Sequence, residues 1–163
     1  MSSQEQRNLS GKRRGAVGVL VEEDRFLVIR RSPFVRAPNL ICFPGGSIEP
    51  GETAEAAVIR EMQEELGLLV SIEQKLWNSV TGWGTELDWF LLKGPPIIQP
   101  LPDPREVSEV FWTHPVDLLG RNDLLGSVHD FFRAIHLGEI ALGSPSNSQT
   151  WSHLIRPQSK TPT

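Results

Sequence analysis

The sequence contains very little cysteine, and this scarcity excludes two ways of stabilising a fold. Cys42 is the only cysteine among 163 residues. Neither an intramolecular disulfide nor a zinc site built from several thiolates can therefore form within one chain. A chain without disulfides suits a reducing compartment, so we expect a cytoplasmic location.

Long apolar runs and an excess of basic residues are also missing. No stretch approaches 18 apolar residues, which predicts that the chain does not span a membrane. The first residues, MSSQEQRNLSGKRRG, lack the apolar centre of a secretory signal, so we expect none. The 16 Lys and Arg against 20 Asp and Glu give a net charge of −4, which argues against a nucleic-acid partner.

The composition that remains is typical of a single globular domain. Hydrophobic residues make up 39% of the chain, and the length suits one domain with a substantial core. The polar, basic residues 1–13 are predicted to form a flexible arm. The domain is expected over residues 14–142, and the polar residues 143–163 are predicted to be a disordered tail.

Hydrophobic periodicity predicts a mixture of strands and helices within this domain. Helices are expected at 53–66, as a short turn at 114–119, and as a closing helix within 122–140. Strands are expected at 15–22, 25–30, 40–43, 68–82, 86–93 and 106–112, with a turn at 44–46. This pattern favours an α/β (α+β) fold in which a mixed sheet lies between helices, a three-layer α/β/α sandwich.

The expected helix at 53–66 carries an unusual group of carboxylates. At 100° per residue, Glu61, Glu64 and Glu65 share an arc of about 100°, and an apolar arc begins beside it. A solvated helix face usually alternates its charges at i,i+4, whereas Glu61 and Glu65 repel each other at that spacing. Hard divalent cations such as Mg²⁺ bind carboxylate oxygens, so the arc suggests a metal site.

The spacing around these carboxylates carries a resemblance to a known family. Gly46, Glu52 and the run Arg60-Glu61-Met62-Gln63-Glu64-Glu65-Leu66-Gly67-Leu68 resemble the Nudix box, G-x5-E-x7-R-E-U-x-E-E-x-G-U, in which U is apolar. All seven specified residues match. Met62 is a mild departure from the usual Ile, Leu or Val. The sequence is therefore similar to MutT-like Nudix hydrolases over about residues 14–142.

The resemblance implies an activity, a cofactor and a set of site residues. Nudix hydrolases cleave a pyrophosphate bond in nucleoside diphosphate-linked substrates, and they use Mg²⁺ or Mn²⁺. Water attacks phosphorus while cations absorb charge on the phosphate oxygens. By motif position, Glu61, Glu64 and Glu65 would bind metal together with the backbone carbonyl of Gly45. Glu52 and Arg60 resemble the ion pair that ties the loop to the helix and orients Glu61.

The identity of the general base is left open by the resemblance. Glu61 is the first choice, and Glu64 is another box carboxylate that the family pattern allows. Glu106 is the second choice, because some relatives place a further metal-binding carboxylate before the corresponding strand. An exposed loop charge is the competing interpretation of Glu106.

Residues outside the box are candidates for substrate contacts. Arg30, Arg31 and Arg36 precede the FPGG segment, and MutT-type relatives carry a substrate-contacting arginine near this place. Arg31 is the candidate phosphate clamp, Arg36 is a second substrate candidate, and Trp83 could stack on a base. A solvated loop for the arginines and an exposed or packing aromatic for Trp83 are the competing interpretations.

Several functions stay open beside a pyrophosphohydrolase of a nucleoside triphosphate or nucleotide sugar. Coenzyme A or ADP-ribose is an alternative substrate, although the longer upstream signature of the coenzyme A branch is absent. A non-catalytic nucleotide-binding domain is disfavoured because no box carboxylate is lost, and an RNA-directed role is disfavoured by the charge. The expected partner is a small nucleotide-type molecule. Dimers are common in the family, so a homodimer is also open.

Overall fold

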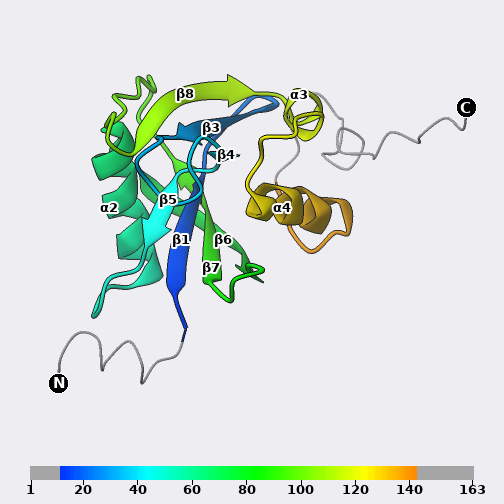
Figure 1. Cartoon of the computed structure of the whole chain (residues 1–163), viewed down its shortest axis with the longest axis horizontal. Helices are drawn as coiled ribbons and strands as arrows, with labels where there is room; N and C mark the ends of the chain where they lie inside the picture. The colour runs from blue at the N-terminus through cyan, green and yellow to red at the C-terminus, as the bar shows by residue number, and fades with distance from the viewer. Residues whose placement is uncertain (1–11, 143–163) are drawn as a thin grey trace, which may run out of the picture.

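The computed structural model describes residues 12–142, and its strands form two sheets (Figure 1). The first sheet has the order β5-β1-β7-β6, in which β1 and β7 run parallel and the other neighbours run antiparallel. It is therefore the mixed sheet that the sequence predicts. Its strands are β1 (Arg14–Val19), β5 (Gly45–Ser47), β6 (Ser71–Val80) and β7 (Glu86–Lys93).

The second sheet is antiparallel and is built around β3. This strand pairs with β2 and β4 along one edge and with β8 along the other. Its register with β8 shifts between Arg30 and Arg31, which marks a bulge at this point. The strands are β2 (Val21–Glu22), β3 (Arg25–Arg31), β4 (Ile41–Cys42) and β8 (Val107–Thr113).

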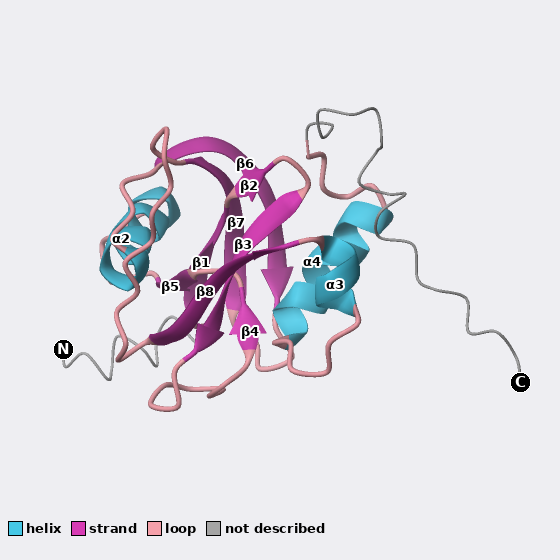
Figure 2. Ribbon diagram, turned by 90° about the horizontal axis from the view of Figure 1, so that it is seen from above, coloured by secondary structure: helices cyan, strands magenta, loops and turns pink. Residues whose placement is uncertain are grey.

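Helices cover the sheets from two sides and give the expected three layers (Figures 1 and 2). Helix α2 (Ala54–Leu66) lies on the first sheet, and it comes close to β1 because Gly18 has no side chain. A Cβ at Gly18 would stand only 3.1 Å from the Met62 sulfur. On the opposite side are α4 (Gly126–His136) and the short α3 (Pro115–Leu119).

Helix α4 is held by an aromatic core. The Phe131 ring stacks on Trp89 of β7, with ring centroids 4.9 Å apart, and also makes an edge contact with Phe43. Phe132 contacts Phe26 of β3 edge-on at 5.4 Å. The same helix therefore packs against residues of both sheets, and the predicted α/β/α fold is confirmed.

Three expected elements differ from the observed ones in their course, and a fourth, the strand expected at 68–82, is shorter and covers Ser71–Val80. The strand expected at 15–22 breaks at Leu20, so that β1 and β2 enter different sheets, and the Leu20 carbonyl accepts the amide of Leu27. The turn expected at 44–46 instead leads directly into β5, which pairs with β1. Pro44, Gly45 and Gly46 predict a turn between β4 and the helix, but they do not indicate that Gly45 and Gly46 pair with β1.

The third difference concerns the start of the closing helix. Residues 122–125 are not helical, Leu124 forms a parallel bridge with Ile41, and α4 begins at Gly126. The Ile41 amide donates to the Asp123 carbonyl, and the Leu125 amide donates to the Ile41 carbonyl. These bonds attach the segment to β4, so tertiary pairing outweighs the helical spacing of Leu124 and Leu125.

The predicted N-terminal arm and C-terminal tail fall largely outside the described residues. This applies to residues 1–11 of the predicted arm and to the whole predicted tail, 143–163. Lys12 and Arg13 are described, and both contact Glu86 at the start of β7. Among residues 12–142, no helix is both long and apolar enough to cross a membrane. The expected cytoplasmic location stays a prediction.

Candidate functional site

Helix α2 carries the site, and its ends form as the sequence indicates. Thr53 caps the first turn, where its hydroxyl accepts the Ala56 amide at 3.1 Å. Gly67 ends the helix in the left-handed region at φ 63°, a conformation that favours glycine. The buried apolar side of the helix includes Val58 and Met62, so its acidic side is turned away from the first sheet's core.

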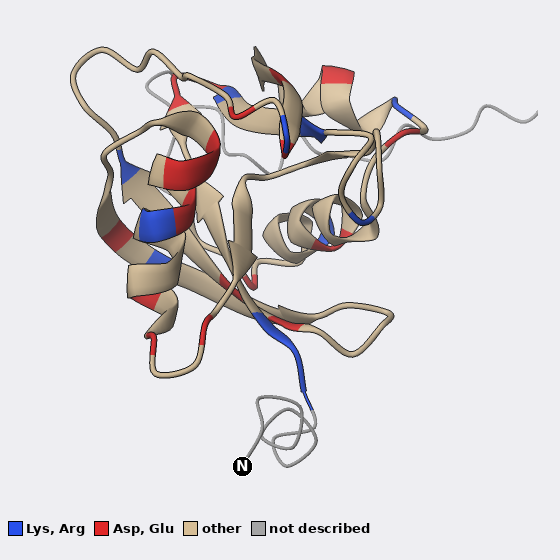
Figure 3. Cartoon of the chain, turned by 60° about the vertical axis from the view of Figure 1, so that its left-hand side comes forward, with Lys and Arg blue, Asp and Glu red and all other residues tan. Residues whose placement is uncertain are grey.

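Three carboxylates converge at this acidic side. Oxygens of Glu61, Glu65 and Glu106 all lie within 4.8 Å of one another. Figure 3 shows how acidic residues gather on α2 and on the loop before it. Glu106 comes from the loop before β8. This loop is attached to the end of α2, because the Asp103 amide donates to the Glu65 carbonyl at 2.9 Å.

The electrostatics of this cluster favour a bound cation. Glu65 is only 5% exposed, and burial followed by the negative charge of Glu61 raises its pKa to about 9. Burial also raises the pKa of Glu61. Folding thus places two acids where ionisation is unfavourable without a compensating positive charge. Carboxylate oxygens are the ligands that Mg²⁺ and Mn²⁺ prefer, so the residues fit a divalent metal.

Arg60 connects the glycine-rich loop to the acidic helix. Its guanidinium forms two hydrogen bonds to the Glu52 carboxylate, at 2.8 and 2.9 Å, and one to Glu61 at 2.9 Å. It also donates to the Ser47 carbonyl. These bonds hold the pKa of Glu52 down to about 2 and raise that of Arg60. The expected ion pair is therefore present, and it touches Glu61 directly.

Glu64 lies apart from the three converging carboxylates. Its side chain is 55% exposed, and it accepts a hydrogen bond from Arg60 at 3.1 Å. Among the described residues, the three-carboxylate cluster contains Glu106 rather than Glu64. The structure thus brings together two of the three box glutamates with the loop glutamate. Whether Glu64 binds a metal is a prediction that the structure leaves untested.

The two glycines before the helix have different packing roles. A Cβ at Gly46 would meet the Glu61 carboxylate, with one oxygen at 2.7 Å, so the absence of a side chain makes room for that acid. A Cβ at Gly45, whose φ is 155°, would collide with the Ala16 carbonyl of β1. Gly45 therefore allows β5 to pair tightly with β1. Its predicted carbonyl ligand role is not tested by these contacts.

The two neighbouring arginines of β3 have different surroundings. Arg31 donates to the Arg36 carbonyl at 2.8 Å and approaches the Cys42 sulfur at 3.8 Å, and its charge lowers the pKa of Glu65. Arg31 therefore belongs to the acidic cluster's surroundings. Arg30 instead pairs with Glu109 at 2.9 Å and Asp123 at 3.0 Å.

The remaining predicted substrate residues are exposed. Arg36 lies in the loop after β3, where its backbone holds Arg31. Trp83 is 76% exposed in the turn between β6 and β7. Figures 1 and 3 both show this turn away from α2. The fold therefore does not bring Trp83 to the carboxylates.

Sequence reasoning missed one buried polar residue near the site. Ser32 is 0% exposed and hydrogen-bonds to the backbone next to Glu106. A serine between an arginine and a proline is an ordinary loop residue in sequence, so no local signal marks it. Its burial depends on contact with a loop far along the chain.

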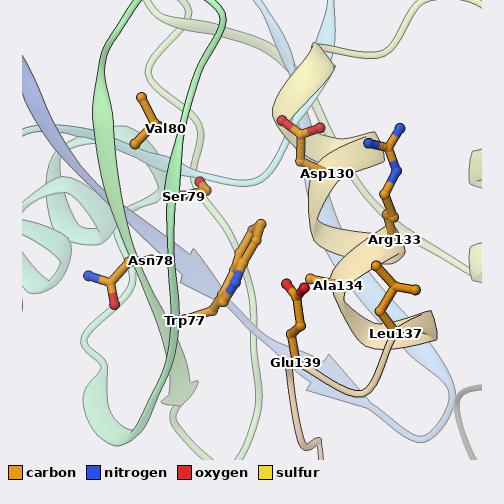
Figure 4. A pocket seen from close by; sticks show the side chains of 9 residues that line it. All are labelled: Trp77, Asn78, Ser79, Val80, Asp130, Arg133, Ala134, Leu137 and Glu139. Atoms are coloured by element: carbon orange, nitrogen blue, oxygen red, sulfur yellow. The ribbon is translucent and has the colours of Figure 1, made fainter.

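A groove of about 430 Å³ lies elsewhere, between β6 and α4 (Figure 4). Trp77 and Val80 border it from the strand, and Arg133 of α4 and its C-cap residue Leu137 border it from the other side. None of the carboxylates of the acidic cluster lines it. The acidic cluster therefore lies outside this groove.

Comparisons with known proteins show what this chain is similar to. The NUDIX domain model matches residues 12–133. An aligned segment of 54 residues is 48% identical to 8-oxo-dGTP diphosphatase of Escherichia coli (strain K12), covering 32% of this chain and 42% of that protein. Another, of 61 residues, is 38% identical to ADP-ribose pyrophosphatase of Methanocaldococcus jannaschii, covering 36% and 34%.

In these alignments the chain spans less than half the length of either curated relative. A solved structure, the MutT protein from Methanosarcina mazei Go1, superposes with a TM-score of 0.62 at 23% identity. The superposition covers 75% of this chain and 91% of the MutT chain. At this identity the likeness concerns the fold.

Proposed function

This chain belongs to the Nudix family, and from that premise we propose that it hydrolyses a pyrophosphate bond in a small nucleoside diphosphate-linked substrate, using Mg²⁺ or Mn²⁺. The oxygen of water forms the new bond to phosphorus, and the bridging oxygen leaves with the other phosphate. The observation that carries the proposal is the convergence of Glu61, Glu65 and Glu106 within 4.8 Å, beside Arg31.

The proposed metal ligands come from α2, from the first residue of β5 and from the loop before β8. Glu61, Glu65 and Glu106 would hold the cation, and Glu64 and the Gly45 carbonyl are further proposed ligands. A bound divalent cation would supply positive charge to the phosphate oxygens. Burial of Glu65 supports this assignment, because a buried carboxylate needs a positive partner to be ionised.

The chain's own side chains have separate tasks in this proposal. Arg60, itself held by Glu52, orients the Glu61 carboxylate through a charge-assisted hydrogen bond. Arg31 offers a guanidinium to a substrate phosphate. Glu61 is the proposed general base, with Glu64 and Glu106 as the alternatives.

The substrate loops complete the proposal. The backbone carbonyl of Arg36 accepts a hydrogen bond from Arg31, so Arg36 lies beside the proposed clamp and is proposed as a second phosphate contact. Trp83 would contact a substrate only if the substrate extends to the turn between β6 and β7. The proposed substrate is therefore bound mainly between the loop after β3 and the acidic side of α2.

The substrate class can be tested with a panel of nucleotides. The panel contains nucleoside triphosphates including 8-oxo-dGTP, ADP-ribose, nucleotide sugars and coenzyme A, because the two curated relatives are named for different substrates. Each compound is incubated with Mg²⁺ or Mn²⁺ in ¹⁸O-water. We expect at least one compound to yield ¹⁸O-labelled phosphate product, and a chelator should stop the reaction.

A matched pair of variants tests the site itself. Glu65→Gln removes a charge from the cluster, and we expect it to lower kcat/KM by about a hundredfold or more. Glu55→Gln removes an equal charge from the exposed first turn of the same helix and should act like wild type. If Glu65→Gln hydrolysed every substrate normally, the assignment of the metal site would be wrong.

A further inference from the structure

Ser32 makes three hydrogen bonds although its side chain is closed off from water. Its hydroxyl donates to the Arg105 carbonyl at 2.7 Å, and its amide donates to the Glu106 carbonyl at 2.9 Å. The hydroxyl oxygen also accepts the Phe34 amide at 3.2 Å. Ser32 is 0% exposed, so no solvent can replace the two bonds of the hydroxyl if the hydroxyl is removed.

The two carbonyls that Ser32 holds bracket the Cα atom of Glu106. The carbonyl of Arg105 lies just before it, and that of Glu106 lies just after it. On the other side of this loop, the Glu106 amide donates to the Asp103 carbonyl, and Asp103 in turn is bound to the end of α2. The backbone of Glu106 is therefore held from two directions.

Ser32 also joins this loop to the segment that carries Arg31. It follows Arg31 directly, and its hydroxyl fixes the start of the next loop through Phe34. A single buried residue thus connects the surroundings of the proposed phosphate clamp to the backbone of the proposed loop ligand.

We propose that Ser32 is a positioning residue that places the Glu106 carboxylate against Glu61 and Glu65 and thereby sets the affinity for the divalent metal. This inference rests on the proposed function, because it requires Glu106 to be a ligand. A purely structural role, in which the hydroxyl only satisfies buried backbone groups, is the competing explanation.

The first experiment measures Mn²⁺ binding to the full chain without substrate, by titration calorimetry or by the electron paramagnetic resonance of free Mn²⁺. Ser32→Ala should weaken Mn²⁺ binding about tenfold, within the range for partners that support metal ligands. Ser108→Ala is the control, because its exposed hydroxyl makes only a 3.4 Å contact with the Arg30 carbonyl. Ser108→Ala should bind Mn²⁺ like wild type.

The second experiment separates positioning from general stability through a double-mutant cycle. Glu106→Gln should weaken Mn²⁺ binding. Ser32→Ala added to Glu106→Gln should then change the Mn²⁺ affinity by less than about twofold, because the group it positions is already altered. A full tenfold loss in that background would overturn the positioning role and favour the structural one. Thermal unfolding of all four proteins accounts for stability.

The remaining outcomes are also distinguishable. Normal Mn²⁺ binding by Ser32→Ala, with weakened binding by Glu106→Gln, would overturn this inference and leave the metal site in place. Normal binding by Glu106→Gln would overturn both Glu106 as a ligand and the role of Ser32. If Ser32→Ala does not fold, Ser32→Cys keeps a small side chain with a weak donor. Because a thiol is a weaker donor and acceptor than a hydroxyl, this variant should hold the loop less firmly and bind Mn²⁺ more weakly than wild type. An affinity equal to that of wild type would overturn the inference.

Discussion

The position of the Glu61 carboxylate depends on the absence of a side chain at Gly46. The Glu61 carboxylate occupies the space where a Cβ of residue 46 would lie, and Arg60 holds it there. We expect Gly46→Ala to displace the carboxylate, because the end of a side chain moves more readily than the paired backbone of β5. Turnover and Mn²⁺ affinity should each fall about 10- to 100-fold, as for lost support of a metal ligand.

The same variant should change stability little, which makes it informative. Gly82→Ala is its control, since a Cβ at Gly82 meets nothing within 4 Å. Thermal unfolding should place both variants near wild type, and only Gly46→Ala should lose metal affinity. Equal activity of the two variants would contradict the role assigned to Gly46.

At the level of elements, Arg60 and Glu52 attach the loop of residues 48–53 to α2. The paired guanidinium keeps the pKa of Glu52 near 2, well below its ordinary value of 4.5. The folded protein therefore gains stability from the ionised Glu52 at pH values above about 4.5. This gain is lost as the pH falls from about 4.5 to about 2.

Urea unfolding between pH 2 and 6 tests this contribution. Glu52→Gln has no carboxylate to protonate, so its free energy of unfolding should fall less steeply with acid than that of wild type. Glu55 is exposed in the first turn of α2, so Glu55→Gln should keep the wild-type slope. An unchanged slope in Glu52→Gln would show that the ion pair contributes nothing to folding.

Local elements were predictable because their signals are local. The capped helix 54–66 and the meeting of Glu61 with Glu65 follow from periodicity and from Thr53 and Gly67. The spacing of the box also predicted the contact between Arg60 and Glu52. Each of these depends on residues that lie within one continuous segment of the chain.

Non-local contacts could be predicted only in part. The resemblance pointed to Glu106, but its position is fixed by the bonds of Asp103 to α2 and of Ser32 to the loop. The sequence also offers no way to distinguish Arg30 from Arg31. Arg30 differs because it forms ion pairs with Glu109 and Asp123, which are far from it in the sequence. The pairing of residues 122–125 with β4 was missed for the same reason.

Over the whole molecule, the negative charge is concentrated at the proposed site. Residues 49–65 contain six glutamates and one arginine, whereas the rest of the chain has 15 basic and 14 acidic residues. Figure 3 places this acidic region on one side of the described chain. The net charge of −4 therefore reflects one loop and one helix, where divalent cations would bring it close to neutrality.

This concentration of charge predicts how the metal-free protein responds to pH. Below pH 4.5, Glu65 is protonated in both the folded and the unfolded chain. Between pH 4.5 and about 9 the unfolded chain releases a proton that folded Glu65 retains. The free energy of unfolding should therefore fall as the pH rises through this window. A bound cation stabilises the ionised form, so saturating Mg²⁺ should reduce or reverse the fall.

Urea unfolding from pH 5 to 9, in chelator and in Mg²⁺, measures this effect as a difference between variants, because other groups titrate as well. Glu65→Gln cannot ionise, so its stability in chelator should fall less with pH than that of wild type, and Mg²⁺ should stabilise it less. Glu55→Gln should retain the wild-type response to both pH and Mg²⁺. If Glu65→Gln and wild type responded alike, Glu65 would not be the buried acid that couples folding to the metal.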